Sequence, residues 1–441
     1  MIVNILGGGI SSLSLAYFLQ NCSYIKKINI FEKEEKIGGL LRSYKIRGLR
    51  YDVGPHIIFS KHKNILKKIK DILGKNKIKI KRSNKIIFKK DILIKYPFEN
   101  ELSKLPKKDL VFALKNFLNN PYRKLKAKNM KIFFLKNFGK GITQLYLEPY
   151  NKKIWKFPVS RLDTQMVNRI PKPPRRDIIN SARGVQTEGY THQLYFYYPK
   201  SGGIESLVES FKKKLNSKVK IFCNVKIKKI NYNYNKFELL YNKKKIKSDK
   251  LFSTIPLNKF CEIFHTTKQI TKISKNLKYN SIIISIFNVK GNIGGDNFAF
   301  MVPDKKIIFH RLSKLDFLGK NYSIKDSTTF EIEITFRKNS KIAKMSNKKL
   351  FIEIFNGLKK IGFVKNKTDI NFYNIKKFNY AYVIYDLQHR KNVDSLLNYY
   401  QKKKITMAGR WGSWEYLNSD QVINQSNILA KNFIQEIKNN I

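Results

Sequence analysis

Short apolar runs near both ends of the chain alternate with segments of helical period. Ile2–Leu6 is an apolar run, Gly7-Gly8-Gly9 follows it, and 10–20 has the 3.6-residue period of a helix. A second apolar run at 28–31 ends in Glu32. This pattern predicts a strand, a tight glycine turn, a helix and a second strand at the N-terminus.

The same patterns locate elements in the rest of the chain. Further helices are predicted at 64–73, 106–119, 126–138, 204–215 and 421–438. Further strands are predicted at 194–198, 218–225, 237–241, 250–256, 281–289, 298–302, 307–312, 328–336 and 404–407. The proline-rich basic segment 171–176 is predicted to be a loop that interrupts helical structure.

The order of these elements predicts an α/β protein of two domains. A chain of 441 residues is long for one domain. Strands and helices alternate at both ends, whereas the middle is rich in strands. We therefore expect a discontinuous nucleotide-binding domain formed by 1–75, 200–262 and 400–441. The second domain would comprise 76–199 and 263–399, with a helical part and an antiparallel sheet.

The glycine turn is the strongest chemical signal. Its pattern is Gly7-x-Gly9-x-x-Ser12, and serine is small enough for the close helix–strand packing required at its third position. Such a turn directs backbone N–H groups and the positive end of a helix dipole at a pyrophosphate. Glu32, at the end of the next strand, is placed to bind a ribose and would repel a 2′-phosphate. We therefore expect a bound dinucleotide, although an ordinary turn without a ligand has the same local pattern.

The chain is strongly basic, with a formal net charge of +58. The lysines are spread along its whole length among many Asn, Ile, Tyr and Phe residues, as expected for AT-rich codons. A nucleic-acid-binding protein concentrates its charge on one motif, and we find none. We interpret the lysines as a solvated surface and expect no specific nucleic-acid partner. Such a field would still attract an anionic substrate.

The cysteines and the apolar segments bear on the cellular compartment. Cys22, Cys223 and Cys261 are far apart and form no metal-binding pattern, so we expect reduced thiols and no metal site. No stretch reaches the roughly 18 apolar residues of a spanning helix, and nothing resembles a signal peptide. The expectation is a cytoplasmic protein without a transmembrane segment.

Several motifs together resemble the FAD-dependent amine-oxidase-like superfamily. They lie in the same order along nearly the whole chain: Gly38-Gly39, Arg42, DVGPHIIFS at 52–60, YPKSGGI at 198–204 and Gly409-Arg410. The superfamily includes monoamine oxidases, protoporphyrinogen oxidases, carotenoid desaturases and UDP-galactopyranose mutases. The resemblance implies a Rossmann-type, glutathione-reductase-like FAD-binding domain with an inserted α+β substrate domain.

Four segments are most similar to the mutases, and they supply the candidate catalytic residues. His56 lies in the segment that the mutases place against the flavin, and Trp155 and Arg169 lie in a Trp…Arg segment. Arg311 lies in a strand that resembles the one supplying an arginine to the substrate. Arginine forks bind phosphate oxygens bidentately, so Arg169 and Arg311 are predicted to clamp a diphosphate. The fourth segment, 409–421, is similar to the C-terminal flavin segment of the mutases.

The resemblance and the glycine turn together give a set of candidate FAD-binding residues. These are Gly7, Gly9, Ile10, Ser11, Glu32, Lys33, Gly39, Arg42, His56, Val225, Gly409, Arg410, Asp420 and Gln421. No cysteine or histidine lies where a covalent flavin tether is expected, so non-covalent FAD is predicted.

Two activities remain open from the sequence. The first is mutase-like chemistry on a nucleotide sugar, with a UDP-sugar as substrate and reduced flavin as the active form; the resemblance then implies a role in cell-envelope polysaccharide synthesis. The second is an FAD oxidase or desaturase acting on an amine, a porphyrinogen or a polyene in a cavity lined by Phe196, Tyr198 and Tyr382. The segment 171–190 matches no mutase feature.

Overall fold

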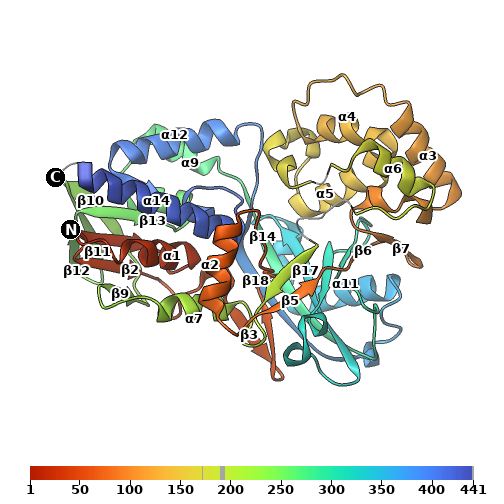
Figure 1. The fold of residues 1–441 in the computed structure, drawn as a ribbon, viewed down its shortest axis with the longest axis horizontal. Coiled ribbons are helices and arrows are strands. Elements are labelled where there is room, and N and C mark those ends of the chain that lie inside the picture. The colour runs from red at the N-terminus through yellow and green to blue at the C-terminus, as the bar shows by residue number, and fades with distance from the viewer. Residues whose placement is uncertain (171, 189–193, 440–441) are drawn as a thin grey trace.

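A parallel sheet forms the left half of the molecule in Figure 1. The computed structural model describes residues 1–170, 172–188 and 194–439. Five parallel strands run in the order β19-β13-β1-β2-β9. Their bounds are Ile405–Met407, Lys250–Ser253, Ile2–Leu6, Lys27–Phe31 and Val219–Phe222. The predicted Rossmann-type fold class is thereby confirmed.

Helices cover this sheet because the strands are apolar on both faces. Four helices contribute to its core: α1 (Ile10–Leu19), α2 (Lys63–Leu73), α7 (Glu205–Lys213) and α14 (Ser419–Asn439). Helix α1 is buried on nearly all sides, and Ser426 of α14 donates to the carbonyl of Ser11 in α1 at 3.1 Å. The two ends of the sequence thus pack together beside the glycine turn. A three-stranded sheet of β10 (Lys229–Asn233), β11 (Lys236–Tyr241) and β12 (Lys244–Ser248) and helices α8 (Leu257–Ile263), α9 (Lys268–Lys275) and α12 (His389–Lys402) complete this half.

A mixed, mainly antiparallel sheet of seven strands forms the second half. Its order is β18-β14-β17-β16-β15-β6-β7. The bounds are Ile370–Val383, Tyr279–Lys290, Ser327–Phe336, Arg311–Lys314, Ala299–Met301, Asn84–Lys89 and Ile92–Lys95. Side chains of β14 alternate between two cores: Ile283 and Phe287 pack with α11 (Asn347–Lys360), whereas Ile282 and Ile284 lie on the opposite face. Two smaller sheets pair β3 (Ser43–Ile46) with β4 (Leu49–Asp52) and β5 (Ile78–Lys81) with β8 (Tyr195–Tyr198).

A helical part lies above this sheet in Figure 1. It contains α3 (Lys107–Leu118), α4 (Met130–Ile142), α5 (Glu148–Trp155) and α6 (Arg175–Ala182). A π-helical turn, Thr143–Leu147, joins α4 to α5. The backbones of α3 and α4 approach closely, since a Cβ at Gly141 would lie 2.5 Å from the carbonyl oxygen of Phe112. Gly141 lies beyond the predicted end of this helix at 138, because α4 continues to Ile142.

Two sequence predictions are wrong in detail. The segment 171–176 is not loop throughout, because α6 begins at Arg175 directly after Pro174, where proline favours a helix start. The strand predicted at 307–312 is present only from Arg311. Ile307 and Phe309 are apolar because they pack beside Gly357 of α11, not because they pair in a sheet.

Candidate dinucleotide and substrate sites

The glycine turn lies at the carboxyl end of β1, and its glycines have different roles. Gly7 has φ of +91° and no room for a side chain, because a Cβ there would lie 2.6 Å from Oγ1 of Thr254. Gly9 precedes the first turn of α1, and a Cβ there would meet no described atom within 4 Å. Ser11 Oγ, in that first turn, is buried without a partner among the described residues. A pyrophosphate fits this space against the helix N-terminus.

Glu32 is held beside the turn by backbone N–H groups. It is buried at the end of β2, and its Oε2 accepts from Gly8 at 2.7 Å while Oε1 accepts from Glu34 at 2.9 Å. Each oxygen keeps a second lone pair, so the carboxylate can also accept from a ribose hydroxyl. The predicted neighbour Lys33 is exposed, and its Nζ lies 3.2 Å from Oε1 of Glu34.

Ser12 and Gly409 bring distant segments to this turn. Ser12 is fully buried, and its Oγ lies 2.9 Å from Oγ1 of Thr254, so serine fits the third position of the motif. Gly409 has φ of +75°, and a Cβ there would lie 2.7 Å from Cβ of Ser11. Its N–H donates to Oε1 of Gln425 in α14 at 2.7 Å. The late Gly409 segment therefore lies against the N-terminus of α1.

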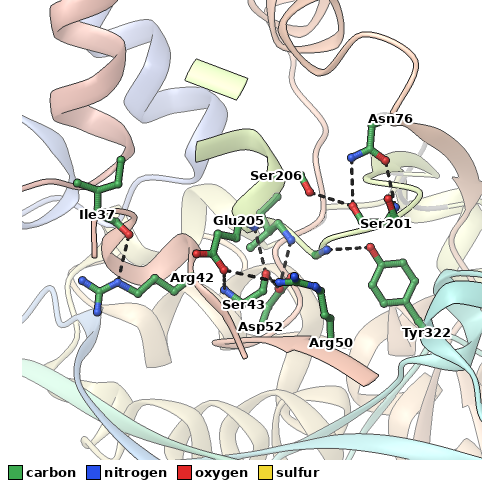
Figure 2. Close-up of polar contacts among 12 residues, drawn as sticks. Ile37, Arg42, Ser43, Arg50, Asp52, Asn76, Ser201, Glu205, Ser206 and Tyr322 are labelled. Carbon is green, nitrogen blue, oxygen red and sulfur yellow. Dashed lines mark hydrogen bonds and ion pairs between the residues drawn. The ribbon is translucent and has the colours of Figure 1, made fainter. Parts of the chain in front are cut away.

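Three other predicted cofactor residues, Gly39, Val225 and Arg42, lie near Gly9 and Glu32 or support the loop beside them. Gly39 has φ of +58°, and a Cβ there would lie 3.4 Å from Cα of Gly9. Val225 donates its N–H to the carbonyl of Glu32 at 2.8 Å. Nε of Arg42 donates to the carbonyl of Ile37 at 3.3 Å (Figure 2). This guanidinium braces the loop that carries Gly39.

A buried carboxylate joins two of the sequence motifs. Asp52, at the end of β4, accepts from Ser43 Oγ at 2.7 Å, from Tyr198 Oη at 2.6 Å and from the N–H of Ile204 at 3.2 Å. Gly203 donates its N–H to Tyr322 Oη at 3.0 Å (Figure 2). Burial raises the pKa of Asp52 to about 6, although its hydrogen bonds oppose that rise. Segments 52–60 and 198–204 are thus parts of one network.

A cavity of about 780 Å³ lies where the seven-stranded sheet, the helical part and segment 410–421 meet. It brings together six of the predicted site residues: His56, Trp155, Arg311, Arg410, Asp420 and Gln421. Arg169 ends the 3₁₀ helix Thr164–Arg169, but its side chain lies outside the described residues. Tyr382 also lines the cavity. The prediction that Phe196 and Tyr198 line it is wrong, because both pack in the core behind Val53.

His56 is neutral at physiological pH. Desolvation lowers its pKa to about 3, assisted by the positive charges of Arg410 and Arg311. Its Nδ1 is buried and has no hydrogen-bond partner in the described parts of the chain. A buried polar atom of this kind is normally satisfied, so Nδ1 is available to a ligand group.

Arg311 is held by a residue that sequence reasoning missed, Glu333. The two are paired in register across β16 and β17, and Nε of Arg311 bonds to Oε1 of the fully buried Glu333. Tyr382 Oη donates to Oε2 of the same carboxylate at 3.1 Å, and His310 Nε2 lies 3.7 Å from it. Desolvation, the largest single effect, would lower the pKa of Arg311, but the charge and hydrogen bond of Glu333 together with Tyr382 and Tyr150 outweigh it, and the pKa lies well above the ordinary value. Glu331 and Glu333, two apart in a predicted strand, were the available signal.

Three aromatic rings form a wall beside this arginine. Trp155 lies edge-on to Tyr382 and Tyr416, with ring centroids 5.9 and 5.8 Å apart. Its Nε1 donates to Oδ1 of Asn151, one turn earlier in α5, at 3.0 Å. The Arg410 guanidinium lies 4.8 Å from the ring centroid of Tyr416. Flat apolar faces beside a cation suit a ligand that combines a ring with a negative charge.

Segment 410–421 is fixed by backbone contacts. Arg410 donates from Nε to Leu417 at 2.8 Å and from Nη1 to Ala381 at 3.0 Å, both to carbonyls. Gln421 Oε1 accepts from the N–H of Asn418 at 2.9 Å. Asp420 lies in the first turn of α14, and burial raises its pKa. Arg410, Asp420 and Gln421 all border the cavity, and the backbone contacts fix the orientation of Arg410.

Glu99 is a second acidic residue that sequence reasoning missed, and unlike Glu333 it lines the cavity. Glu99 is 1% exposed, and its Oε1 has no hydrogen-bond partner among the described residues. Burial raises its pKa to about 7. No local pattern distinguishes it, since it lies between Phe98 and the polar residues Asn100 and Glu101.

In the described ranges, no three His, Cys, Asp or Glu residues are grouped as a metal would require. Within the same ranges, no helix has the length and apolar character needed to cross a bilayer.

Comparisons with known proteins agree with this geometry. A family profile described as a NAD(P)-binding Rossmann-like domain matches residues 5–72. Protoporphyrinogen oxidase of Dictyostelium discoideum is 24% identical over 382 residues, which cover 69% of this chain and 70% of that protein. The crystal structure of reduced UDP-galactopyranose mutase matches with a TM-score of 0.89 at 21% identity and covers 98% of this chain and 95% of that chain. Wild-type putrescine oxidase bound to putrescine matches with a TM-score of 0.67 at 13% identity over 99% of both chains. The chain therefore contains an N-terminal NAD(P)-binding Rossmann-like domain and shares the fold of UDP-galactopyranose mutase and putrescine oxidase.

Proposed function

We propose that this chain is an FAD-dependent enzyme of the mutase type that acts on a UDP-sugar with the flavin reduced. The observation that carries the proposal is the cavity in which Arg311, fixed by Glu333, faces an aromatic wall that includes Trp155. Support also comes from the close match in fold to reduced UDP-galactopyranose mutase.

The residues around the glycine turn fit a non-covalently bound FAD. The open space at Gly9 and the unpartnered Ser11 Oγ suit the pyrophosphate, and Glu32 suits the ribose. In this proposal segments 1–75, 200–262 and 400–441 form the FAD-binding domain. FAD, when bound, supplies the redox and nucleophilic chemistry of its flavin ring. His56 offers a neutral imidazole at the cavity wall that can hydrogen-bond the flavin or the substrate.

The charges that line the cavity favour an anionic substrate. Among the described residues, five cationic side chains and two acidic side chains border it. The cationic ones are Lys61, Arg82, Lys172, Arg311 and Arg410, and the acidic ones are Glu99 and Asp420. A diphosphate would pair with the arginines, and Trp155 would pack against a ring of the nucleotide sugar. Arg169 is proposed as the second arginine of the clamp.

The second candidate is an FAD-dependent oxidoreductase. It is favoured by the sequence match to protoporphyrinogen oxidase and by the fold match to putrescine oxidase. An apolar or amine substrate would use the aromatic wall but would offer no negative charge to the cationic side chains of the cavity.

One experiment separates the two activities. The purified yellow protein is incubated with UDP-galactopyranose and related UDP-sugars, oxidised or reduced with dithionite. Turnover only in the reduced state, without oxygen consumption, supports the mutase type. Oxygen consumption with an amine or a porphyrinogen, and no turnover of UDP-sugars, supports the oxidoreductase. Release of all the yellow colour on acid precipitation tests non-covalent binding.

A further inference from the structure

One helical face supplies much of the cavity wall. The π-helical turn and α5 place six residues on it: Tyr146, Leu147, Tyr150, Asn151, Ile154 and Trp155. They recur at intervals of four, as expected for one face of a helix. The position and tilt of α5 therefore determine where Trp155 lies relative to Arg311, which also lines the cavity.

Side chains of the seven-stranded sheet form hydrogen bonds with the carboxyl end of α5. The last carbonyls of a helix lack partners within the helix. Asn280 Nδ2 donates to the carbonyls of Ile154 at 3.0 Å and Trp155 at 2.7 Å. Thr335 Oγ1 donates to the carbonyls of Lys153 at 3.2 Å and Ile154 at 2.7 Å. Asn280 and Thr335 are both fully buried, so these are fixed contacts in the interior.

A side chain of α5 makes a reciprocal contact. Lys153, which is buried, donates from Nζ to the carbonyls of Val302 and Asp304, each at 2.8 Å. Helix α5 is therefore attached to two parts of the sheet domain: to β14 and β17 through its carbonyls, and to the chain after β15 through Lys153.

The strands that hold α5 carry Glu333 and pair with the strands that carry Arg311 and Tyr382. Thr335 lies two residues after Glu333 in β17, so both side chains point to the same face. Asn280 of β14 is paired in register with Tyr382 of β18, whose hydroxyl donates to Glu333. Asn280 and Thr335, which hold α5, are thus neighbours of Tyr382 and Glu333 in the sheet.

We infer that Asn280 and Thr335 are positioning residues that set the aromatic wall of α5 against the Arg311–Glu333 pair. Neither Asn280 nor Thr335 is among the described residues that line the cavity. This inference rests on the proposed function, because the substrate contacts that they align are those of the UDP-sugar.

The test compares two isosteric substitutions in the same strand. Thr335→Val removes the hydroxyl that holds α5. Thr328→Val is the matched control, because Thr328 is equally buried in β17 and donates to the carbonyl of Gly291 at 2.8 Å, away from α5. UDP is titrated into each FAD-loaded variant and followed by flavin absorbance. We expect UDP affinity to fall about tenfold in Thr335→Val, and to stay within about twofold of wild type in Thr328→Val and in the hydroxyl-retaining Thr335→Ser.

A second measurement does not depend on UDP. Acrylamide quenching is recorded for the tryptophan fluorescence component that Trp155→Phe removes. Loosening of α5 should make this component more accessible in Thr335→Val but not in Thr328→Val. Equal quenching and equal UDP affinity in the two variants would overturn the inference. If wild type does not bind UDP, the proposed substrate is wrong, and the quenching comparison alone decides the positioning role.

Discussion

Arg311→Lys tests whether the arginine fork, and not only its charge, binds the substrate. Nε of Arg311 bonds to Glu333, so this one contact fixes the guanidinium while its terminal nitrogens carry four further N–H groups. The side chain is 29% exposed, and it borders the cavity. A phosphate oxygen pair can therefore be bound by both terminal nitrogens at once.

The size of the effect follows from what lysine retains. Lysine keeps one positive charge near Glu333 but offers no planar fork, so at least one charge-assisted hydrogen bond to the phosphate is lost. Such a bond contributes about 1.5–3 kcal/mol, which corresponds to roughly ten- to a hundredfold in the dissociation constant. FAD binding should not change, because Arg311 lies in the seven-stranded sheet and not beside the glycine turn.

The assay is a UDP titration of the FAD-loaded protein, followed by flavin absorbance. Arg50→Lys is the control, because Arg50 forms a surface ion pair of 4.0 Å with Glu205 and does not line the cavity. Arg169→Lys is measured alongside, and non-additive losses in the double variant would indicate one shared diphosphate. If Arg311→Lys binds UDP as tightly as wild type, the clamp is wrong, and the oxidoreductase becomes the better proposal.

Three further predictions follow from buried carboxyl groups. Glu32→Ala should weaken FAD binding by roughly ten- to a hundredfold through loss of the ribose contact, and an unchanged flavin dissociation constant would exclude that role. Burial raises the pKa of Glu99 to about 7, so affinity for a UDP-sugar should fall between pH 6 and pH 8 as its negative charge appears; Glu99→Gln should abolish this dependence, and equal slopes would contradict it. The pKa of Asp52 is about 6 in the folded protein and ordinary when unfolded, so the wild type loses about 1.4 kcal/mol of stability between pH 5 and pH 8 that Asp52→Asn does not lose. Urea unfolding of both proteins at the two pH values measures that difference, and parallel changes would refute it.

The sequence predicted the parts of the fold that have local signals. The glycine turn, the strands at 2–6 and 28–31 and the helix that closes the chain are confirmed, because each combines an apolar period with a clear boundary. Strand β18 was not predicted. It is an edge strand rich in Asn, Lys and Tyr, with alternate residues exposed, so it lacks the apolar run that marked the other strands.

The site was predictable only as a set of separate motifs. His56, Trp155, Arg311 and Arg410 were selected by resemblance, and the structure places them around one cavity. Their roles remain predictions. Glu333 was missed because its importance depends on register pairing with Arg311 across two strands, which no local pattern reveals. Helix α5 was missed because a π-helical turn shifts its apolar period relative to that of α4.

The pairing of Arg311 with Glu333 also constrains how an anionic substrate is bound. The buried carboxylate of Glu333 cancels most of the Arg311 charge at a distance. The pair therefore orients a bound phosphate through hydrogen bonds more than it attracts the substrate from solution. A diphosphate carries two negative charges, and its attraction must come from other cations around the cavity. Arg410 is tied to two carbonyls and stacks on Tyr416, which fixes it near the wall. Lys61, Arg82 and Lys172 also border the cavity and can supply part of this attraction, and Arg169 is the residue that the sequence predicts as the second arginine of the clamp.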